Sequence, residues 1–350
     1  MNSDLIPHSR PWLTKEDFIK INEILESGLI ATGDKVIDFE NSLNKYFRTK
    51  NSVVTSSGTN ALIMALKILE VNKNDEVILP SYVCDSVIES VRICGATPVI
   101  CDIGAYWNMT LENTEKFISK KTKAIILVHQ FGIALNTKEF KTFNLPIIED
   151  CCQSFGANYK NKKVGTIGDL GVFSFNATKC LTTGYGGALI SNSNELLERI
   201  NEIKNDCKNL SLMTDIQAAL GLSQLSRYEK FLELRYSMAN KYLENLPFDL
   251  INKINSIKKN SIFYRFLINT SNSLNFDTLK RYYSKEGISI RRGVDDLLHR
   301  KNNISDKYYL NSVKCFDHTL SIPIYPSLSK EEQDKIIEVT NSFYMKGILK

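Results

Sequence analysis

Residues 146–191 decide the fold, and they read PIIEDCCQSFGANYKNKKVGTIGDLGVFSFNATKCLTTGYGGALIS. This stretch contains three short apolar runs, Pro146–Glu149, Gly171–Phe175 and Ala188–Ser191. Each run is nearly continuous in apolar residues instead of alternating with polar ones. Such runs are typical of parallel strands, which are covered on both faces of their sheet. The stretch therefore predicts the centre of a mostly parallel sheet.

Four more runs of the same kind precede this stretch. They are Ser52–Thr55, Glu76–Leu79, Pro98–Asp102 and Ala124–His129. Helical patterns lie between the runs, for example at Asn60–Leu69 and Cys84–Cys94. Strands that alternate with helices predict an α/β fold, here a mostly parallel seven-stranded sheet flanked by helices.

After Gly187 the pattern becomes mainly helical, and the chain is expected to divide into two domains. Residues 1–235, with a helical N-terminal segment, are expected to form the large domain. Residues 236–350 are expected to form a smaller α+β domain with a strand at Ile262–Ile268 and a closing helix at Lys330–Tyr344. A chain of 350 residues is long enough to bury two such cores.

The composition excludes several classes of protein. The net charge of +5 is mild and the basic residues are scattered, so no nucleic-acid partner is expected. The lysines within 160–163 are interpreted as a solvated turn. Eight cysteines without a CxxC pair and four histidines without an HxxxH pair predict no metal site and favour a reducing compartment. No apolar stretch is long enough to span a bilayer, so the protein is expected to be cytoplasmic.

Three pieces of the sequence stand in an order that suits an aromatic phosphate cofactor. The first is Ser56–Asn60, SSGTN, which lies between a strand and a helix. A glycine there lets the backbone approach a ligand closely, and the amide groups of the helix N-terminus favour an anion. Taken alone, such a turn is often only a structural connection between a strand and a helix, without a ligand.

The second piece is Ile147–Cys151, an apolar strand that ends in two carboxylates. Ligands of open α/β sheets bind beyond the carboxyl ends of the strands. A buried carboxylate needs a cationic partner, and a pyridinium nitrogen would supply one for Asp150. The strand alone leaves this reading and a simple capping role for Asp150 equally open.

The third piece is Gly171–Lys179, GVFSFNATK, in which a lysine follows a strand. A lysine beside an apolar wall and a cation can have a lowered pKa, which a Schiff-base amine needs. A lone lysine would more often be a surface residue, but Lys179 follows two other segments whose residues suit a cofactor.

The chain resembles the DegT/DnrJ/EryC1/StrS family of pyridoxal-phosphate (PLP) dependent aminotransferases over most of its length. The matching motifs are SSGTNAL (56–62), DEVILPSY (75–82), GATPVICDI (95–103), VHQFG (128–132), IIEDCCQSFGA (147–157), GDLGVFSFNATKCLTTGYGGAL (168–189), DIQAALGLSQL (215–225) and SIPIYPSLS (321–329). The resemblance implies the fold-type-I aminotransferase architecture, and a homodimer with active sites at the subunit interface.

The resemblance also implies roles for individual residues. Lys179 matches the Schiff-base lysine that moves protons, and Asp150 matches the carboxylate that keeps the pyridine nitrogen protonated. Gln153 matches a residue on the ring-hydroxyl side. The phosphate-binding residues of the family match Gly58, Thr59 and Ser174.

The sequence departs from the family at three places. Where many members stack an aromatic residue on the cofactor ring, this chain has Cys84, with Tyr82 two positions earlier; either one could cover the ring. The segment Gly184–Gly187 replaces a GEGG sequence. The G-x-N-x-R stretch that reaches a partner subunit's phosphate is not intact in 205–213, where Asn209 is the candidate substitute.

The resemblance implies transfer of an amino group, with L-glutamate as the donor, to a nucleotide-linked keto sugar. Three alternatives differ in how well the residues support them. A keto-cyclitol acceptor stays open, and a sugar dehydratase is disfavoured because members with that activity replace the lysine by histidine. A non-catalytic scaffold is disfavoured because Asp150, Gln153, Ser174 and Lys179 are all present. His129 is interpreted as a structural hydrogen-bonding residue, and Arg291 and Arg292 as either a diphosphate-binding or a surface pair.

Overall fold

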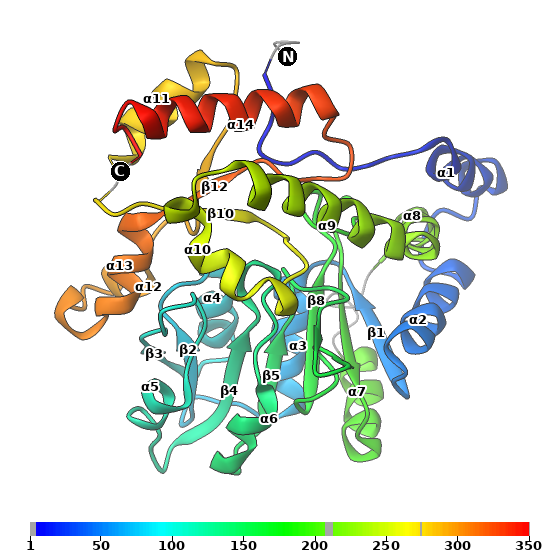
Figure 1. The fold of residues 1–350 in the computed structure, drawn as a ribbon. Helices are drawn as coiled ribbons and strands as arrows, with labels where there is room; N and C mark the ends of the chain where they lie inside the picture. The colour runs from blue at the N-terminus through cyan, green and yellow to red at the C-terminus, as the bar shows by residue number, and fades with distance from the viewer. Residues whose placement is uncertain (1–4, 207–212, 274, 350) are drawn as a thin grey trace.

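The computed structural model describes residues 5–206, 213–273 and 275–349. All seven predicted strands form one sheet (Figure 1), in the spatial order β1-β9-β8-β5-β4-β2-β3. The strands are β1 (Asn51–Thr55), β2 (Glu76–Pro80), β3 (Thr97–Cys101), β4 (Thr122–Val128), β5 (Ile147–Asp150), β8 (Leu170–Ser174) and β9 (Gly187–Ser191). The predicted α/β fold with a mostly parallel seven-stranded sheet is confirmed.

One strand runs against the others. β2, β3, β4, β5 and β8 pair in parallel, whereas β9 is antiparallel to both β8 and β1. β8 and β9 follow each other without an intervening helix, and strands joined in this way pair antiparallel. The connection returns through Gly184 and Gly186, whose φ angles of 80° and 158° suit a residue without a side chain.

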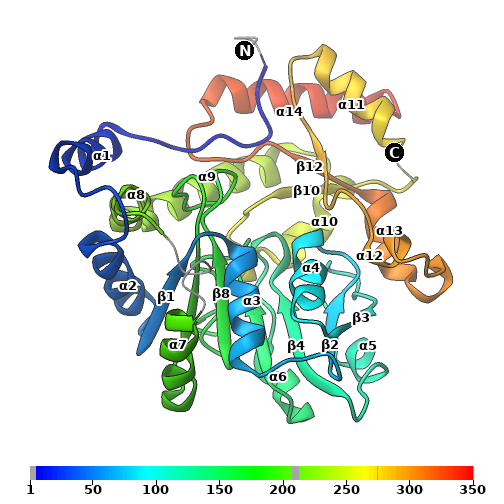
Figure 2. The ribbon, with the colours of Figure 1, turned by 180° about the vertical axis from the view of Figure 1, so that it is seen from behind.

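Helices cover the sheet on both sides, and Figure 2 shows α3 and α7 in front of it. The helices up to the middle of the chain are α1 (Lys15–Ser27), α2 (Asp34–Phe47), α3 (Gly58–Ile68), α4 (Asp85–Ile93), α5 (Leu111–Glu115), α6 (Thr137–Phe140) and α7 (Asn194–Asp206). Those that follow are α8 (Asp215–Ser226), α9 (Tyr228–Asn245), α10 (Phe248–Ser256), α11 (Phe276–Lys285), α12 (Leu298–Lys301), α13 (Leu310–His318) and α14 (Lys330–Met345). Within the described residues no helix is long and apolar enough to cross a membrane.

The C-terminal part has its own three-stranded antiparallel sheet, in the order β10-β12-β11. Its strands are β10 (Phe266–Asn269), β11 (Arg291–Arg292) and β12 (Thr319–Ile322). The N-terminal segment joins this part, because the amide of Ile6 donates to Gly287 and the carbonyl of Ile6 accepts from Ser289. The division between residues 235 and 236 stays a prediction, and α9 runs continuously across it.

The strand predicted at Ile262–Ile268 begins later than expected, at Phe266. The preceding residues pair with another part of the chain instead. Ser261 forms an antiparallel bridge with Ile133, and the amide of Ile262 donates to Gly132. Phe263 then has a positive φ of 51°, which turns the backbone before β10 begins.

The lysine-rich stretch predicted as a solvated turn is a hairpin, formed by β6 (Asn158–Tyr159) and β7 (Lys162–Lys163). Its two turn residues, Lys160 and Asn161, both have positive φ angles, as a two-residue hairpin turn requires. The solvated interpretation is wrong for Lys163. Its side chain is half-buried, and its ammonium group lies 3.8 Å from the centre of the Tyr46 ring.

Candidate active site

Adjacent carboxylates at the end of β5 point to opposite sides of the strand, because side chains alternate along it. Glu149 is fully buried, and its Oε1 accepts hydrogen bonds of 2.7 Å from the amides of Ile167 and Gly168. Its Oε2 accepts one from the Thr137 hydroxyl at 2.7 Å. Burial alone would raise the pKa of Glu149. Hydrogen bonds from His129 and from these groups lower the pKa by more than burial raises it, so the net shift is downward. Glu149 is a structural anion.

His129 belongs to the same buried network. Its Nδ1 accepts a hydrogen bond of 3.0 Å from the amide of Leu135, so the ring proton lies on Nε2. Nε2 in turn donates to Glu149 Oε2 at 2.9 Å. Both ring nitrogens are occupied by structural partners, as the interpretation of His129 as a structural hydrogen-bonding residue requires.

Asp150 lies on the other side of β5, where it is 4% exposed. Its Oδ1 accepts a hydrogen bond of 2.9 Å from the amide of Cys152. The carboxylate is close enough to Cys84 and to Lys179 to shift the pKa of both groups. The strand end therefore brings one buried carboxylate, one thiol and one amine together.

Lys179 follows β8 and faces a residue from the C-terminal part of the chain. Its ammonium group lies 5.3 Å from the ring centre of Tyr264. Burial lowers the pKa of Lys179, but Tyr264, the thiols of Cys152 and Cys84, and Asp150 raise it, and the net shift is upward. The expected lowered pKa is thus wrong for the chain without cofactor, because the sequence did not reveal that a phenol, two thiols and a carboxylate surround the lysine.

The N-terminus of α3 forms a narrow space beside β8. Ser57 caps the helix by accepting a hydrogen bond of 3.1 Å from the Asn60 amide. The helix leaves the amides of Gly58 and Thr59 without partners inside it. A β-carbon added at Gly58 would lie 2.8 Å from the β-carbon of Ser174 and 3.1 Å from the Cys152 sulfur. Two amide donors, a hydroxyl and a glycine-lined space form a cradle that suits a phosphate group.

Gln153 has one end of its amide fixed. Its Oε1 accepts a hydrogen bond of 3.0 Å from the amide of Phe131. The amide nitrogen of Gln153 can therefore donate to a ligand, as contact with a ring hydroxyl would require.

The structure distinguishes between Tyr82 and Cys84, the two residues that could cover a cofactor ring. Tyr82 is fully buried, its ring 6.0 Å from that of Phe131, and a β-carbon at Gly293 would lie only 2.1 Å from its hydroxyl. Cys84, by contrast, is exposed at the start of α4, with its sulfur 3.0 Å from the Ser86 hydroxyl. Because Tyr82 is enclosed in the core and has no open face, the geometry favours Cys84 as the group that meets the ring.

Sequence reasoning missed Tyr264 and Arg265. Arg265 is anchored by two hydrogen bonds of 2.8 Å from Nη1 to the carbonyls of Arg292 and Gly293. Its guanidinium carbon lies 6.0 Å from the ring centre of Tyr264, the phenol that faces Lys179, so Arg265 places a cation beside that phenol. The available signal was a Tyr-Arg pair inside an otherwise apolar run. By contrast, Arg292 lies against Phe276 and Phe316, at 4.8 and 4.4 Å from the ring centres.

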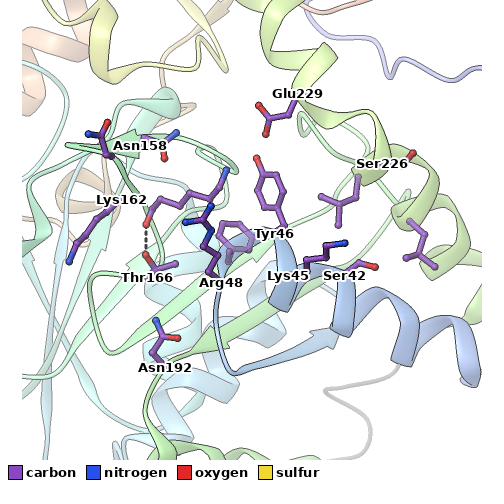
Figure 3. Close-up of a pocket in the computed structure, with 15 residues that line it drawn as sticks. Ser42, Lys45, Tyr46, Arg48, Asn158, Lys162, Thr166, Asn192, Ser226 and Glu229 are labelled. Atoms are coloured by element: carbon purple, nitrogen blue, oxygen red, sulfur yellow. Dashed lines mark hydrogen bonds between the residues drawn. The ribbon is translucent and has the colours of Figure 1, made fainter.

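The candidate substitute Asn209 lies outside the described residues. No group of three or more metal-ligating side chains occurs in the part of the chain that the structure describes. A large cavity of about 970 Å³ lies elsewhere, between α2, the β6–β7 hairpin and α9 (Figure 3), and none of the predicted site residues lines it.

Comparisons with known proteins agree with this geometry. The sequence model of the DegT/DnrJ/EryC1/StrS aminotransferase family matches residues 11–341. The chain belongs to this family. GDP-perosamine synthase from Escherichia coli O157:H7 is 31% identical, over 97% of this chain and 98% of that protein. The dTDP-3-amino-3,6-dideoxy-alpha-D-galactopyranose transaminase from Aneurinibacillus thermoaerophilus is 30% identical, over 92% and 94%.

A solved structure of the PLP form of the putative sugar aminotransferase Spr1654 from Streptococcus pneumoniae superposes with a TM-score of 0.86. Its sequence is 26% identical, and the match covers 98% of this chain and 99% of that one. This DegT/DnrJ/EryC1/StrS family member is therefore a PLP-dependent aminotransferase. The cradle beside Gly58, the buried carboxylate of Asp150 and the amine of Lys179 fit the phosphate, ring nitrogen and aldehyde of that cofactor.

Proposed function

We propose that this aminotransferase transfers an amino group from L-glutamate to the keto group of a nucleotide-linked keto sugar. Two relatives that match nearly the whole chain are named for amino sugars carried by GDP or dTDP, which supports this class of acceptor. The observation that carries the proposal is the grouping of Asp150, Lys179 and the α3 cradle at the carboxyl ends of the strands.

Each site residue has a role in this proposal. Lys179 would hold PLP through its aldehyde group and would move protons at the substrate carbon, and Asp150 would keep the ring nitrogen protonated. When bound, the cofactor supplies an electron sink for the negative charge that develops at that carbon. Gln153 donates to the ring hydroxyl, while Cys84 covers the ring. The amides of Gly58 and Thr59 and the Ser174 hydroxyl hold the phosphate.

We also propose a homodimer with shared active sites and a cytoplasmic location. Several large apolar side chains are exposed on α1 and the segment after it, which supports an interface there. The seven cysteines within the described residues are all free thiols, which supports a reducing compartment. The division into residues 1–235 and 236–350 belongs to the same proposal.

A keto-cyclitol acceptor is the second candidate, because nothing in the described site selects a nucleotide. A scaffold without catalysis is disfavoured by the intact grouping around Lys179.

The test is the visible absorption spectrum of the purified chain with PLP, before and after addition of L-glutamate. A band that forms with PLP, is absent in Lys179→Ala and disappears with glutamate would support the first half-reaction. Restoration of the band by a nucleotide-linked keto sugar, but not by a keto-cyclitol, would support the acceptor. A wild-type chain that gives no band at saturating PLP would refute the proposed catalytic site.

A further inference from the structure

A second site with ligand-binding character lies away from Lys179. The cavity of about 970 Å³ shown in Figure 3 opens between the end of α2, the β6–β7 hairpin and the α8–α9 corner. Its size lies at the upper end of the range of small-molecule sites, about 300–1,000 Å³. The polar residues that line it are Ser42, Lys45, Tyr46, Arg48, Asn158, Asn161, Lys162, Lys163, Thr166, Asn192, Ser226 and Glu229.

Two cations from separate elements point toward each other in this cavity (Figure 3): Arg48, which follows α2, and Lys163 of β7. Lys45 and Lys162 also line the cavity, but adjacent side chains on a strand alternate, and the amine of Lys162 points away from Arg48 and Lys163. Among the described residues, no carboxylate lies within ion-pair distance of any of the four. Like charges held together without a counter-ion repel each other, so a bound anion would stabilise this arrangement.

Helix polarity explains only part of this cluster. Lys45 and Arg48 stand at the carboxyl end of α2, where the helix dipole favours cations. It does not explain why the hairpin brings Lys163 to the same place as Arg48. The convergence of the two elements is what points to a ligand.

The hairpin side of the cavity is held in place by aromatic packing. The ammonium group of Lys163 lies over the Tyr46 ring at 3.8 Å, and that ring stacks on Phe155 at 5.3 Å. Burial lowers the pKa of Lys163, Glu229 raises it and Arg48 lowers it, with a net downward shift. An anion bound here would raise that pKa, which is the condition for favourable binding to the charged amine.

We propose that this cavity binds the diphosphate group of a phosphate ester through Arg48 and Lys163. Arginine and lysine are the usual partners of phosphate oxygens, since their N–H groups form charge-assisted hydrogen bonds. The side-chain amides of Asn158 and Asn192 supply neutral donors for the rest of a larger ligand. The proposal does not depend on the function assigned to Lys179.

The test is titration calorimetry of the full chain with saturating PLP, at constant ionic strength, with pyrophosphate, UDP and GDP as probes. Occupied cofactor sites prevent the probes from binding in the α3 cradle. We expect saturable binding that Arg48→Asn and Lys163→Gln each weaken by about tenfold or more, as loss of a charge-assisted hydrogen bond would. Asparagine is chosen at position 48 because it tolerates the positive φ of 55° there.

Two further variants separate a specific site from general charge and from misfolding. Glu229→Gln removes the one carboxylate that lines the cavity and should strengthen binding, a gain that a folding defect cannot produce. Lys160→Asn removes a hairpin lysine that does not line the cavity, and should leave binding unchanged. Tighter binding of UDP or GDP than of pyrophosphate would identify a nucleotide as the ligand, and equal binding would identify the free anion.

Three results would overturn the proposal. These are no saturable binding of any probe, binding that Arg48→Asn and Lys163→Gln leave unchanged, and a loss in Lys160→Asn as large as in those variants.

Discussion

At the residue scale, Lys179 is surrounded by one phenol, one carboxylate and two thiols, contributed by three separate segments. Tyr264 is the member of this group that the C-terminal part contributes. Burial raises the pKa of Tyr264, but Lys179 and Arg265 lower it, so the tyrosine and the lysine shift each other in opposite directions. The two residues form a coupled pair in which the phenol favours the protonated amine.

Tyr264→Phe should therefore lower the pKa of Lys179, because the group that most strongly raises it is removed. The fraction of free amine at a fixed pH below that pKa then increases. The measurement is the pH dependence of labelling of Lys179 by an amine-reactive reagent in the cofactor-free chain, read by peptide mass spectrometry. Tyr236→Phe, on the solvent side of α9, is the matched control. An unchanged labelling profile in Tyr264→Phe would refute the coupling.

Glu149 supports a second prediction, which concerns stability. In Glu149→Gln the new amide nitrogen would face the Thr137 hydroxyl and the N–H of His129, whose tautomer is fixed by Leu135. A buried donor then meets a donor, and we expect a loss of about 2–4 kcal/mol in the free energy of unfolding at neutral pH. Chemical denaturation measures this loss.

The same variant tests a pH dependence. The folded pKa of Glu149 is lowered, so its contribution to stability is present above the unfolded value, about 4.3, and is lost as the pH falls through the folded value. Glu149→Gln should be less sensitive to acid over this window than the wild type. The surface variant Glu89→Gln should change stability by only about 0.5 kcal/mol and keep the acid dependence. Equal losses in both variants would contradict the buried-anion role.

At the scale of elements, the closeness of α3 to β8 creates the phosphate cradle. Gly58→Ala places a β-carbon 2.8 Å from the β-carbon of Ser174, so the helix and strand must separate or the added atom must occupy the cradle. We expect a stability loss of about 1–3 kcal/mol. We also expect cofactor affinity to fall by about tenfold or more, as when a hydrogen bond to a charged group is lost. Absorbance titration with PLP measures this affinity.

Gly28→Ala is the control for this prediction. Gly28 ends α1 with a φ of 70°, and nothing lies within 4 Å of an added β-carbon. The substitution should cost about 1–2 kcal/mol through backbone strain but leave cofactor affinity unchanged. If the two alanine variants bound PLP equally well, Gly58 would not be part of the cradle.

The elements of the sheet could be predicted from the sequence because their signal is local. All seven apolar runs became strands whose ends differ by at most two residues from the prediction. The positions of Asp150 and Lys179 could also be predicted from the sequence. Asp150 ends one predicted strand and Lys179 follows another, so the order of residues along the chain is enough to locate them. The N-terminal side of β10 could not be placed in this way, because Ser261 and Ile262 pair with residues near Gly132, far away in the sequence.

The parts of the site that escaped prediction depend on the same long-range contacts. Tyr264 reaches Lys179, and Arg265 reaches Tyr264, because the segment before β10 is held by contacts with other parts of the chain. Arg235 of α9 is buried and donates to the carbonyls of Phe263, Tyr264 and Ile324. No local pattern in the sequence reveals that a helix residue orients this segment, so the environment of Lys179, and with it the direction of its pKa shift, was predicted wrongly.

At the scale of the whole molecule, the distribution of exposed apolar side chains is uneven. Phe18 and Leu25 of α1, Leu29 after it and Ile37 of α2 are all more than half exposed, at 56%, 53%, 74% and 55%. In Figure 1, α1 lies at the margin of the molecule, at the end of the extended N-terminal segment. Apolar side chains gathered at one margin are typical of an association surface.

The double variant Phe18→Glu with Leu29→Glu should dissociate the proposed homodimer, because two charges would be buried against an apolar partner. Sedimentation velocity should then report a particle of 39.8 kDa, where the wild type gives twice that mass. Because the proposed active sites are shared between subunits, the monomer should also bind PLP more weakly. The matched control places the same charges at two other exposed apolar positions, Ile93 and Met345. Dissociation of both double variants, or of neither, would mean that the surface around α1 is not the interface.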